Sequence, residues 1–226
     1  MQLAEAATRA EELARSGGAE RELAELRASW DDEIEAAARS GDYRVRGQAY
    51  RAIAQFRFRQ KLELLRRGLE DESAGARGSA LIALRSLSSD HPGDVNGFRP
   101  LLNELAKRDP NAAVRRLAIL CLENGTADRG SIQLLDGIAG DDEADRDVRE
   151  TARKVSAALL KKSRAKSLAR EAGIRRSGFP PLGSPPPAGH VPKGVGCAAA
   201  TAPLLRCQRL RAIRPMRRAT VSNTLP

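Results

Sequence analysis

Apolar residues recur at helical spacing through most of the chain, and the stretch Arg108–Leu122 shows this pattern most cleanly. Its apolar positions lie three or four residues apart: Val114, Leu117, Ala118 and Cys121. This spacing places them on one face of an α-helix. Asp109 and Pro110 stand just before the run, where an acidic cap and a proline in the first turn favour a helix start. The stretch therefore predicts an amphipathic helix that begins at Asp109.

Three further stretches repeat the pattern: Gly41–Phe56, Glu70–Leu87 and Asp142–Leu159. In each copy an arginine follows Val or Ala and precedes an alanine by three residues. The four motif arginines, separated by 31, 38 and 34 residues, are Arg46, Arg77, Arg115 and Arg149. The acidic residues upstream of them are Asp42, Asp71, Asp109, and either Asp142 or Asp145. A period of this length with two helices per unit is typical of stacked helical repeats.

The segments between these copies predict a second set of helices, which form the outer layer. The expected outer helices are Glu20–Ala38, Arg59–Leu69, a third that Pro100 begins or kinks and that ends near Lys107, and a fourth capped by Asp128. The polar segment Ser88–Gly97 contains Gly and Pro and predicts a long turn, which accounts for the 38-residue spacing. The amphipathic stretch Leu3–Arg15 predicts a helix that caps the stack.

The acidic helix starts, the Val-Arg pairs and the alanines resemble the HEAT repeat, in particular the short HEAT-like repeats of bacterial phycobilin lyases. The resemblance covers about Arg21–Lys162, and the second copy departs from it with Ala76 in place of Val. It implies an all-α fold: a short right-handed α-solenoid of about four helix pairs. It also implies a protein that binds other proteins, less often nucleic acids or cofactors.

The charge of the chain is unevenly divided. Residues 1–160 contain 25 basic and 28 acidic residues, whereas residues 161–226 contain 14 basic residues and one acid. The net charge of +10 therefore comes from the C-terminal part, which is also rich in Pro and Gly. This composition predicts disorder. We expect a capping helix and turn at 1–19, a HEAT-like repeat domain at 20–172, and a disordered basic arm at 173–226.

Two sets of charged residues are candidates for a role. The inner helices of a solenoid line its concave surface, where partners usually bind. The expected partner-binding residues are Tyr43, Arg44, Arg51, Arg116, Arg153 and Lys154. The alternative is a solvated face of mixed charge.

The motif arginines, together with Asp42, Asp71 and Asp109, are expected to form a structural ladder between neighbouring repeats. The alternative for these arginines is a row that binds phosphate or a carboxylate-rich partner. The structural role is favoured because the arginine recurs with the fold itself.

The residues predict no catalytic, cofactor or metal site. The chain has two histidines, three cysteines without a CxxC pair, and no phosphate-binding glycine motif. No apolar run reaches transmembrane length, and we expect a cytoplasmic protein with Cys121 in the core. The leading hypothesis is a noncatalytic scaffold or adaptor that binds another protein. A nucleic-acid-associated protein that uses the concave arginines and the basic arm is the second hypothesis, and a lyase-like enzyme is the third.

Overall fold

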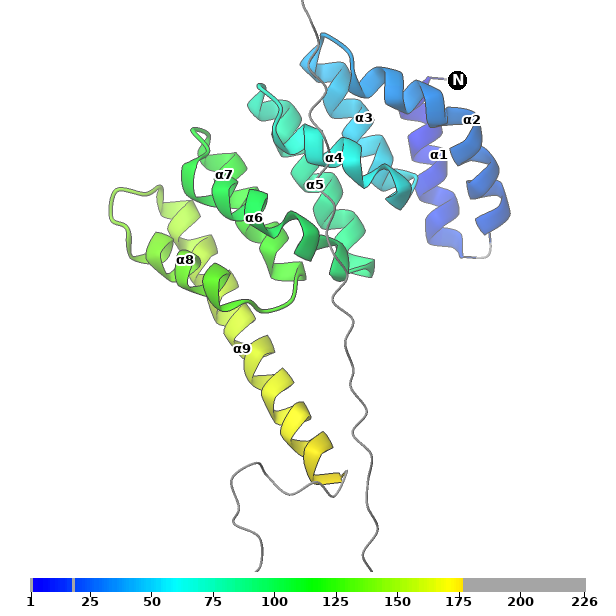
Figure 1. Ribbon diagram of the computed structural model, residues 1–226. Helices are drawn as coiled ribbons and strands as arrows, with labels where there is room; N and C mark the ends of the chain where they lie inside the picture. The colour runs from blue at the N-terminus through cyan, green and yellow to red at the C-terminus, as the bar shows by residue number, and fades with distance from the viewer. Residues whose placement is uncertain (1, 18, 177–226) are drawn as a thin grey trace, which may run out of the picture. The chain divides into compact units, whose positions relative to one another are not determined.

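The computed structural model describes residues 2–17 and 19–176, in which all regular structure is helical. Nine α-helices and one short 3₁₀ helix follow one another through this part of the chain. They are α1 (Leu3–Ser16), α2 (Glu20–Ala38), α3 (Tyr43–Gln55), η1 (Arg59–Lys61), α4 (Leu62–Leu69), α5 (Ala74–Asp90), α6 (Gly93–Arg108), α7 (Ala112–Asn124), α8 (Arg129–Gly140) and α9 (Arg146–Arg176). Figure 1 shows them stacked in chain order.

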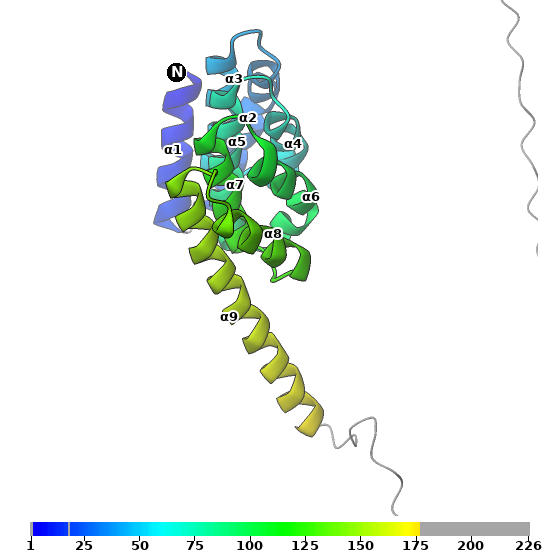
Figure 2. The same ribbon diagram turned by 90° about the vertical axis from the view of Figure 1, so that its left-hand side faces the viewer.

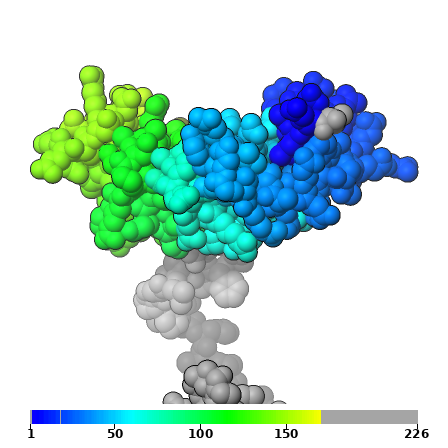
Figure 3. Space-filling model, turned by 90° about the horizontal axis from the view of Figure 1, so that it is seen from above, coloured from blue at the N-terminus to red at the C-terminus, as the bar shows by residue number. Residues whose placement is uncertain are grey.

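The helices form two layers. The inner layer contains α1, α3, α5, α7 and α9, each packed against the next. The outer layer contains α2, α4, α6 and α8, and each of these packs against the inner helix that follows it. Figure 3 shows consecutive repeats side by side, and Figure 2 looks along the stack, so that the repeats overlap in the view. The expected all-α solenoid of four helix pairs is confirmed, and α1 adds a fifth helix to the inner layer.

Small residues let neighbouring helices approach one another closely. The four motif alanines, Ala49, Ala80, Ala118 and Ala152, are all fully buried. Gly68 of α4 lies so near α3 and α5 that an added Cβ would come within 2.9 Å of both the Tyr50 ring and the Ala80 side chain. The larger core residues are mainly leucine and isoleucine, with Leu65, Leu84 and Ile119 completely buried. The sparse aromatic content of the chain is thus compatible with a continuous core.

The prediction of a long turn at Ser88–Gly97 is wrong. Helix α5 continues to Asp90 and α6 begins at Gly93, so only two residues separate them. Burial explains the difference, since Val95 and Phe98 both belong to the core and draw this polar segment into a helix. Pro100 consequently lies inside α6 and does not begin it.

Two of the predicted helix caps are displaced by two residues. The N-cap residues of α5 and α7 are Ser73 and Asn111, and Asp71 and Asp109 precede them. Asp71 accepts a hydrogen bond from the backbone N–H of Ser73, and Asp109 accepts one from that of Asn111. The acids therefore stabilise the turns before the helices and keep an oxygen free for a partner from the preceding repeat.

Helix α9 continues beyond the stack, as Figures 1 and 2 show. Its last buried residue in the described part is Leu159. The predicted repeat domain ended at residue 172, whereas α9 ends at Arg176. The rest of the predicted arm, residues 177–226, lies outside the described residues. No helix within residues 2–17 and 19–176 combines the length and the apolar character needed to cross a membrane.

Candidate interaction face

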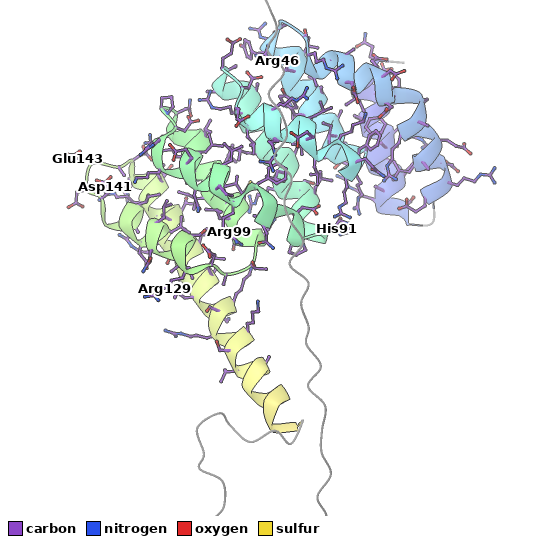
Figure 4. The ribbon with its side chains drawn as sticks, viewed as in Figure 1. Arg46, His91, Arg99, Arg129, Asp141 and Glu143 are labelled. Atoms are coloured by element: carbon purple, nitrogen blue, oxygen red, sulfur yellow. The ribbon has the colours of Figure 1, made fainter. Side chains whose placement is uncertain are left out.

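The motif arginines of the first two repeats tie successive repeats together. The Arg46 guanidinium donates from Nε and Nη2 to the two carboxylate oxygens of Asp71, both at 2.7 Å. Its Nη1 donates to the carbonyl oxygens of Ser40 and Gly41 at 2.9 and 3.1 Å. One side chain thus joins the turn before α3 to the turn before α5. Figure 4 shows Arg46 at the edge of the stack formed by these turns and His91 near the opposite edge.

Arg77 repeats this arrangement one unit further along. Its Nε and Nη2 donate to Asp109 at 2.7 and 3.0 Å, while its Nη1 donates to the carbonyl oxygens of Asp71 and Glu72. Both ion pairs are well buried: the side chains of Asp71 and Asp109 are only 6% and 2% exposed. Two-point contacts of this kind fix geometry as well as charge.

Only the first two motif arginines form such a buried ion pair with an acid of the following repeat, and we call each of these pairs a rung of the ladder. The third and fourth motif arginines are bound differently. Arg115 donates to the carbonyl oxygen of Asp109 at 2.9 Å, and among the described residues it lies within salt-bridge distance of no carboxylate. Arg149 pairs with Asp142 of its own repeat, and this carboxylate is almost fully exposed. Asp42 caps α3 through the N–H of Arg44 and meets none of the motif arginines.

The rung at Asp71 shifts the pKa values of both partners. Burial raises the pKa of Asp71, but the hydrogen bonds from Arg46 and Ser73 outweigh burial, and the pKa lies below its ordinary value. The hydrogen bond to Asp71 raises the pKa of Arg46. Both groups are therefore held in their charged forms, as expected for a structural pair.

Charge is segregated between the inner helices and the first outer helix. Helices α3, α5 and α7 together contain seven arginines and only two acids, Asp90 and Glu123, which lie in their last turns. Helix α2 shows the opposite balance, with seven acids and two arginines. The inner layer therefore presents positive charge over the middle of the stack.

Four of these arginines are exposed, and we call them the inner-face cations: Arg44, Arg51, Arg85 and Arg116. Within the described residues, none of the four lies within salt-bridge distance of a carboxylate. Tyr43 is 45% exposed, and the Arg44 guanidinium lies 5.7 Å from the centre of its ring. Lys154 is also exposed, but it pairs with Glu150 at 2.7 Å.

Arg153 does not lie on this face, contrary to the expectation from sequence. It occupies the helical position that is filled by Tyr50, Leu81 and Ile119 in the preceding copies, where each residue is buried. No fifth helix pair follows α9 in the described part of the chain, so this position is exposed at the end of the stack. The Arg153 guanidinium donates to the carbonyl oxygen of Ala139 in α8.

Sequence reasoning missed two residues of the inner face. Arg85 lies eight residues after the motif arginine of its repeat, where the other copies have Ala54, Glu123 and Ala157, so no recurring basic residue marks this position. Ile82 was assigned no role, yet it is 49% exposed, the highest value among the large hydrophobic residues of α1–α8. Ile82 stands in the repeat position of Arg51, Leu120 and Lys154, of which two are basic and one is apolar, so the sequence pattern gave only a weak signal.

A groove of about 520 Å³, which we call the inner groove, follows α3 between α1 and α5. The buried alanines Ala7, Ala52 and Ala83 line it, one from each helix. Arg51 and Ile82 lie along it, and Glu11 lies on the α1 side. Both oxygens of Glu11 are already engaged, by Arg15 at 2.5 Å and by the Gln55 amide at 3.1 Å. The groove thus combines apolar side chains and an unpaired cation with polar residues such as Gln48 and Gln55.

The described residues offer little for metal or thiol chemistry. Within residues 2–17 and 19–176, His, Cys, Asp and Glu side chains nowhere gather in a group suited to hold a metal ion. Burial raises the pKa of the Cys121 thiol to about 12, and its Sγ donates to the carbonyl oxygen of Leu81 at 3.2 Å. Cys121 is therefore a core residue with little thiolate at neutral pH.

Paired helices that stack in register through small residues define the class of α-solenoids. Residues 31–96, which extend from within α2 to the start of α6, match a family model described as HEAT repeats. Residues 31–96 are thus HEAT repeats, and the remaining helix pairs continue the same stack. No curated protein matches the chain.

Proposed function

We propose that the repeat unit is a noncatalytic scaffold that binds another protein through its inner helices. The segregation of charge carries this proposal, because the three middle inner helices have arginines without acidic partners while α2 is acidic. Exposed arginines cost the free protein little, and they supply charge complementarity to an acidic partner. HEAT repeats commonly mediate interactions between proteins, which agrees with this function.

A nucleic-acid-binding function is the second candidate, since the same inner-face cations could contact phosphates. The exposed Ile82 in the middle of this face favours a protein partner, because an isolated aliphatic side chain offers nothing to a phosphate backbone. The two functions differ in their response to salt. Affinity for nucleic acid should fall steeply and linearly in log–log form with salt concentration, whereas affinity for a partly apolar protein surface should fall less.

The test is a triple charge reversal on the inner face. Arg51→Glu, Arg85→Glu and Arg116→Glu combined should abolish capture of the partner, while the circular dichroism spectrum stays helical. All three residues are exposed. Each single reversal should weaken capture only in part, because an exposed ion pair contributes about 0.2–1 kcal/mol and the reversal adds a repulsion of similar size. The readout is affinity capture with the full chain, followed by mass spectrometry of the proteins retained.

A matched control changes the net charge equally on the other layer. Arg67, Lys107 and Arg129 are exposed on α4, α6 and α8, and their combined reversal to Glu should leave capture unchanged. If the folded inner-face variant retains the same proteins as the original chain, the inner helices are not the binding face. Equal loss in both variants would point to net charge and would likewise contradict the proposal.

A further inference from the structure

The inner groove is an open site lined by residues of three helices. It follows α3 and is flanked by α1 and α5, so its long direction is set by three helices already packed side by side. Ala7, Ala52 and Ala83 contribute only methyl groups to its lining and are almost completely buried. They form the floor of the groove, and the partly buried Leu3, Ala14 and Ala54 supply apolar surface that a ligand can still cover.

The exposed apolar side chain and the unpaired cation of the groove come from two neighbouring helices. Ile82 on the α5 side exposes nearly half of its surface. A ligand that covered this side chain would be stabilised by the burial of apolar surface. Arg51 lies on α3 in the middle of the groove, and its only hydrogen bond within the described residues is a long one of 3.4 Å, from Nε to the carbonyl oxygen of Gly47. Arg51 therefore remains available to a carboxylate.

The acid that lines the groove does not cancel this cation. Glu11 is engaged by Arg15 and Gln55, and Arg57 at the end of the groove pairs with Asp90 at 3.0 Å. Arg85 and Arg44 extend the unpaired positive charge beyond the groove along α5 and α3. A ligand that lies on Ile82 thus meets positive charge on its flanks.

We propose that the inner groove binds an acidic amphipathic helix of another protein. An apolar side chain of this helix packs on Ile82 and on the alanine lining, and carboxylates at helical spacing pair with Arg51 and Arg85. This inference rests on the proposed function and specifies its site and the chemistry of its partner. Helix-in-groove recognition uses apolar anchors at the i, i+3, i+4 and i+7 positions, which match a groove that follows a helix axis.

The experiment uses synthetic helical peptides of about 15–20 residues as probes. The acidic probe carries leucines at i, i+3, i+4 and i+7 with glutamates beside them. One matched peptide replaces the glutamates by lysines, and another replaces the leucines by alanines. A single-stranded DNA oligonucleotide serves as a polyanion without apolar anchors. Binding to the full chain is measured by fluorescence anisotropy, and we expect the acidic leucine peptide to bind at least about tenfold more tightly than each of the three others.

Two variants of the protein test the groove itself. Arg51→Glu should weaken binding of the acidic peptide about tenfold, by removing one attraction and adding a repulsion. Ser86→Trp places a large side chain at an exposed position of the groove lining. Because this side chain occupies the groove, it should also weaken binding of the acidic peptide about tenfold. Arg67→Glu, an equal charge reversal on the outer helix α4, should leave affinity within about twofold. Circular dichroism establishes that each variant is folded.

Three outcomes would overturn the inference. They are equal binding of the glutamate and lysine peptides, tighter binding of the oligonucleotide than of the acidic peptide, and unchanged peptide affinity in both groove variants. If any one of them occurs while the inner-face triple variant still loses its captured partner, the proposed function stands and only the proposed binding site is wrong. If the triple variant also keeps its partner, both proposals fail together.

Discussion

Two sets of arginines on the inner helices have opposite surroundings. At the turn edge, Arg46 and Arg77 are mostly buried, and each meets a carboxylate at two points. On the inner face, Arg51, Arg85 and Arg116 are exposed and face no carboxylate within the described residues. A buried guanidinium without a partner would be strongly unfavourable, whereas an exposed one is solvated. The first set therefore belongs to the fold, and the second is free for a ligand.

Adjacent residues in α7 show that position on the helix decides the role. Arg115 is half-buried and donates to the carbonyl oxygen of Asp109, while Arg116 is exposed. One step along a helix turns a side chain by about 100°. A count of arginines therefore says little about binding, and the predictions below compare matched changes at the two positions.

The largest expected effect follows from removing a buried carboxylate of the ladder. Asp109→Ala leaves the Arg77 guanidinium without its ion-pair partner and the N–H of Asn111 without its acceptor. We expect a loss of about 3–5 kcal/mol in the free energy of unfolding, as for other broken buried pairs. Arg116→Ala should change it by no more than about 0.5 kcal/mol. Denaturant unfolding followed by circular dichroism measures both, and similar values would erase the distinction between the two sets.

A conservative change should separate the two sets more finely. Arg46→Lys keeps the charge but cannot reproduce the forked contact with Asp71 or the bonds to the carbonyl oxygens of Ser40 and Gly41. We expect a loss of about 1.5–3 kcal/mol, the range for hydrogen bonds to charged groups. Arg51→Lys should leave the stability unchanged. Melting temperatures of the two lysine variants provide the measurement. If Arg46→Lys were as stable as Arg51→Lys, charge alone would be enough to stabilise the contact with Asp71.

The rung at Asp71 also predicts a pH dependence. Because the pKa of Asp71 is lowered in the folded protein, the folded state favours the carboxylate, and this contribution is present at neutral pH. It is lost as the pH falls below the ordinary value of about 4 and through the lowered pKa. In Asp71→Asn the stability should fall less steeply over this acidic range. Unfolding measured at a series of pH values tests this, and identical pH profiles for the two proteins would contradict it.

The repeat architecture was predictable because the stack imposes the same local requirement four times. Every inner helix needs an alanine where its neighbour comes closest, and all four motif alanines are buried. Every repeat also needs a well-satisfied turn, and this need explains the recurring acid. The number of helix pairs and their order could therefore be read from the spacing of a few residues.

The remaining features depend on packing that no local pattern encodes. The segment around Val95 is helical because the core covers its apolar side chains, although its polar residues favour a turn. Arg153 shares its register with buried residues, and its exposure follows only from its place at the end of the described stack. Ile82 shares its repeat position with the apolar Leu120, yet only Ile82 is exposed, and sequence alone does not distinguish the two.

The smallest expected effect concerns that end of the stack. Arg153 was expected on the binding face, but it donates to the carbonyl oxygen of Ala139 and lies at the position of the buried Tyr50. Arg153→Glu should therefore leave partner capture within about twofold and stability within about 0.5 kcal/mol. Arg51→Glu is the matched change on the inner face and should weaken binding of the acidic helical peptide about tenfold. If Arg153→Glu reduced peptide binding as strongly as Arg51→Glu, the ligand would have to reach the last repeat, and a groove limited to α1, α3 and α5 could not be its whole site.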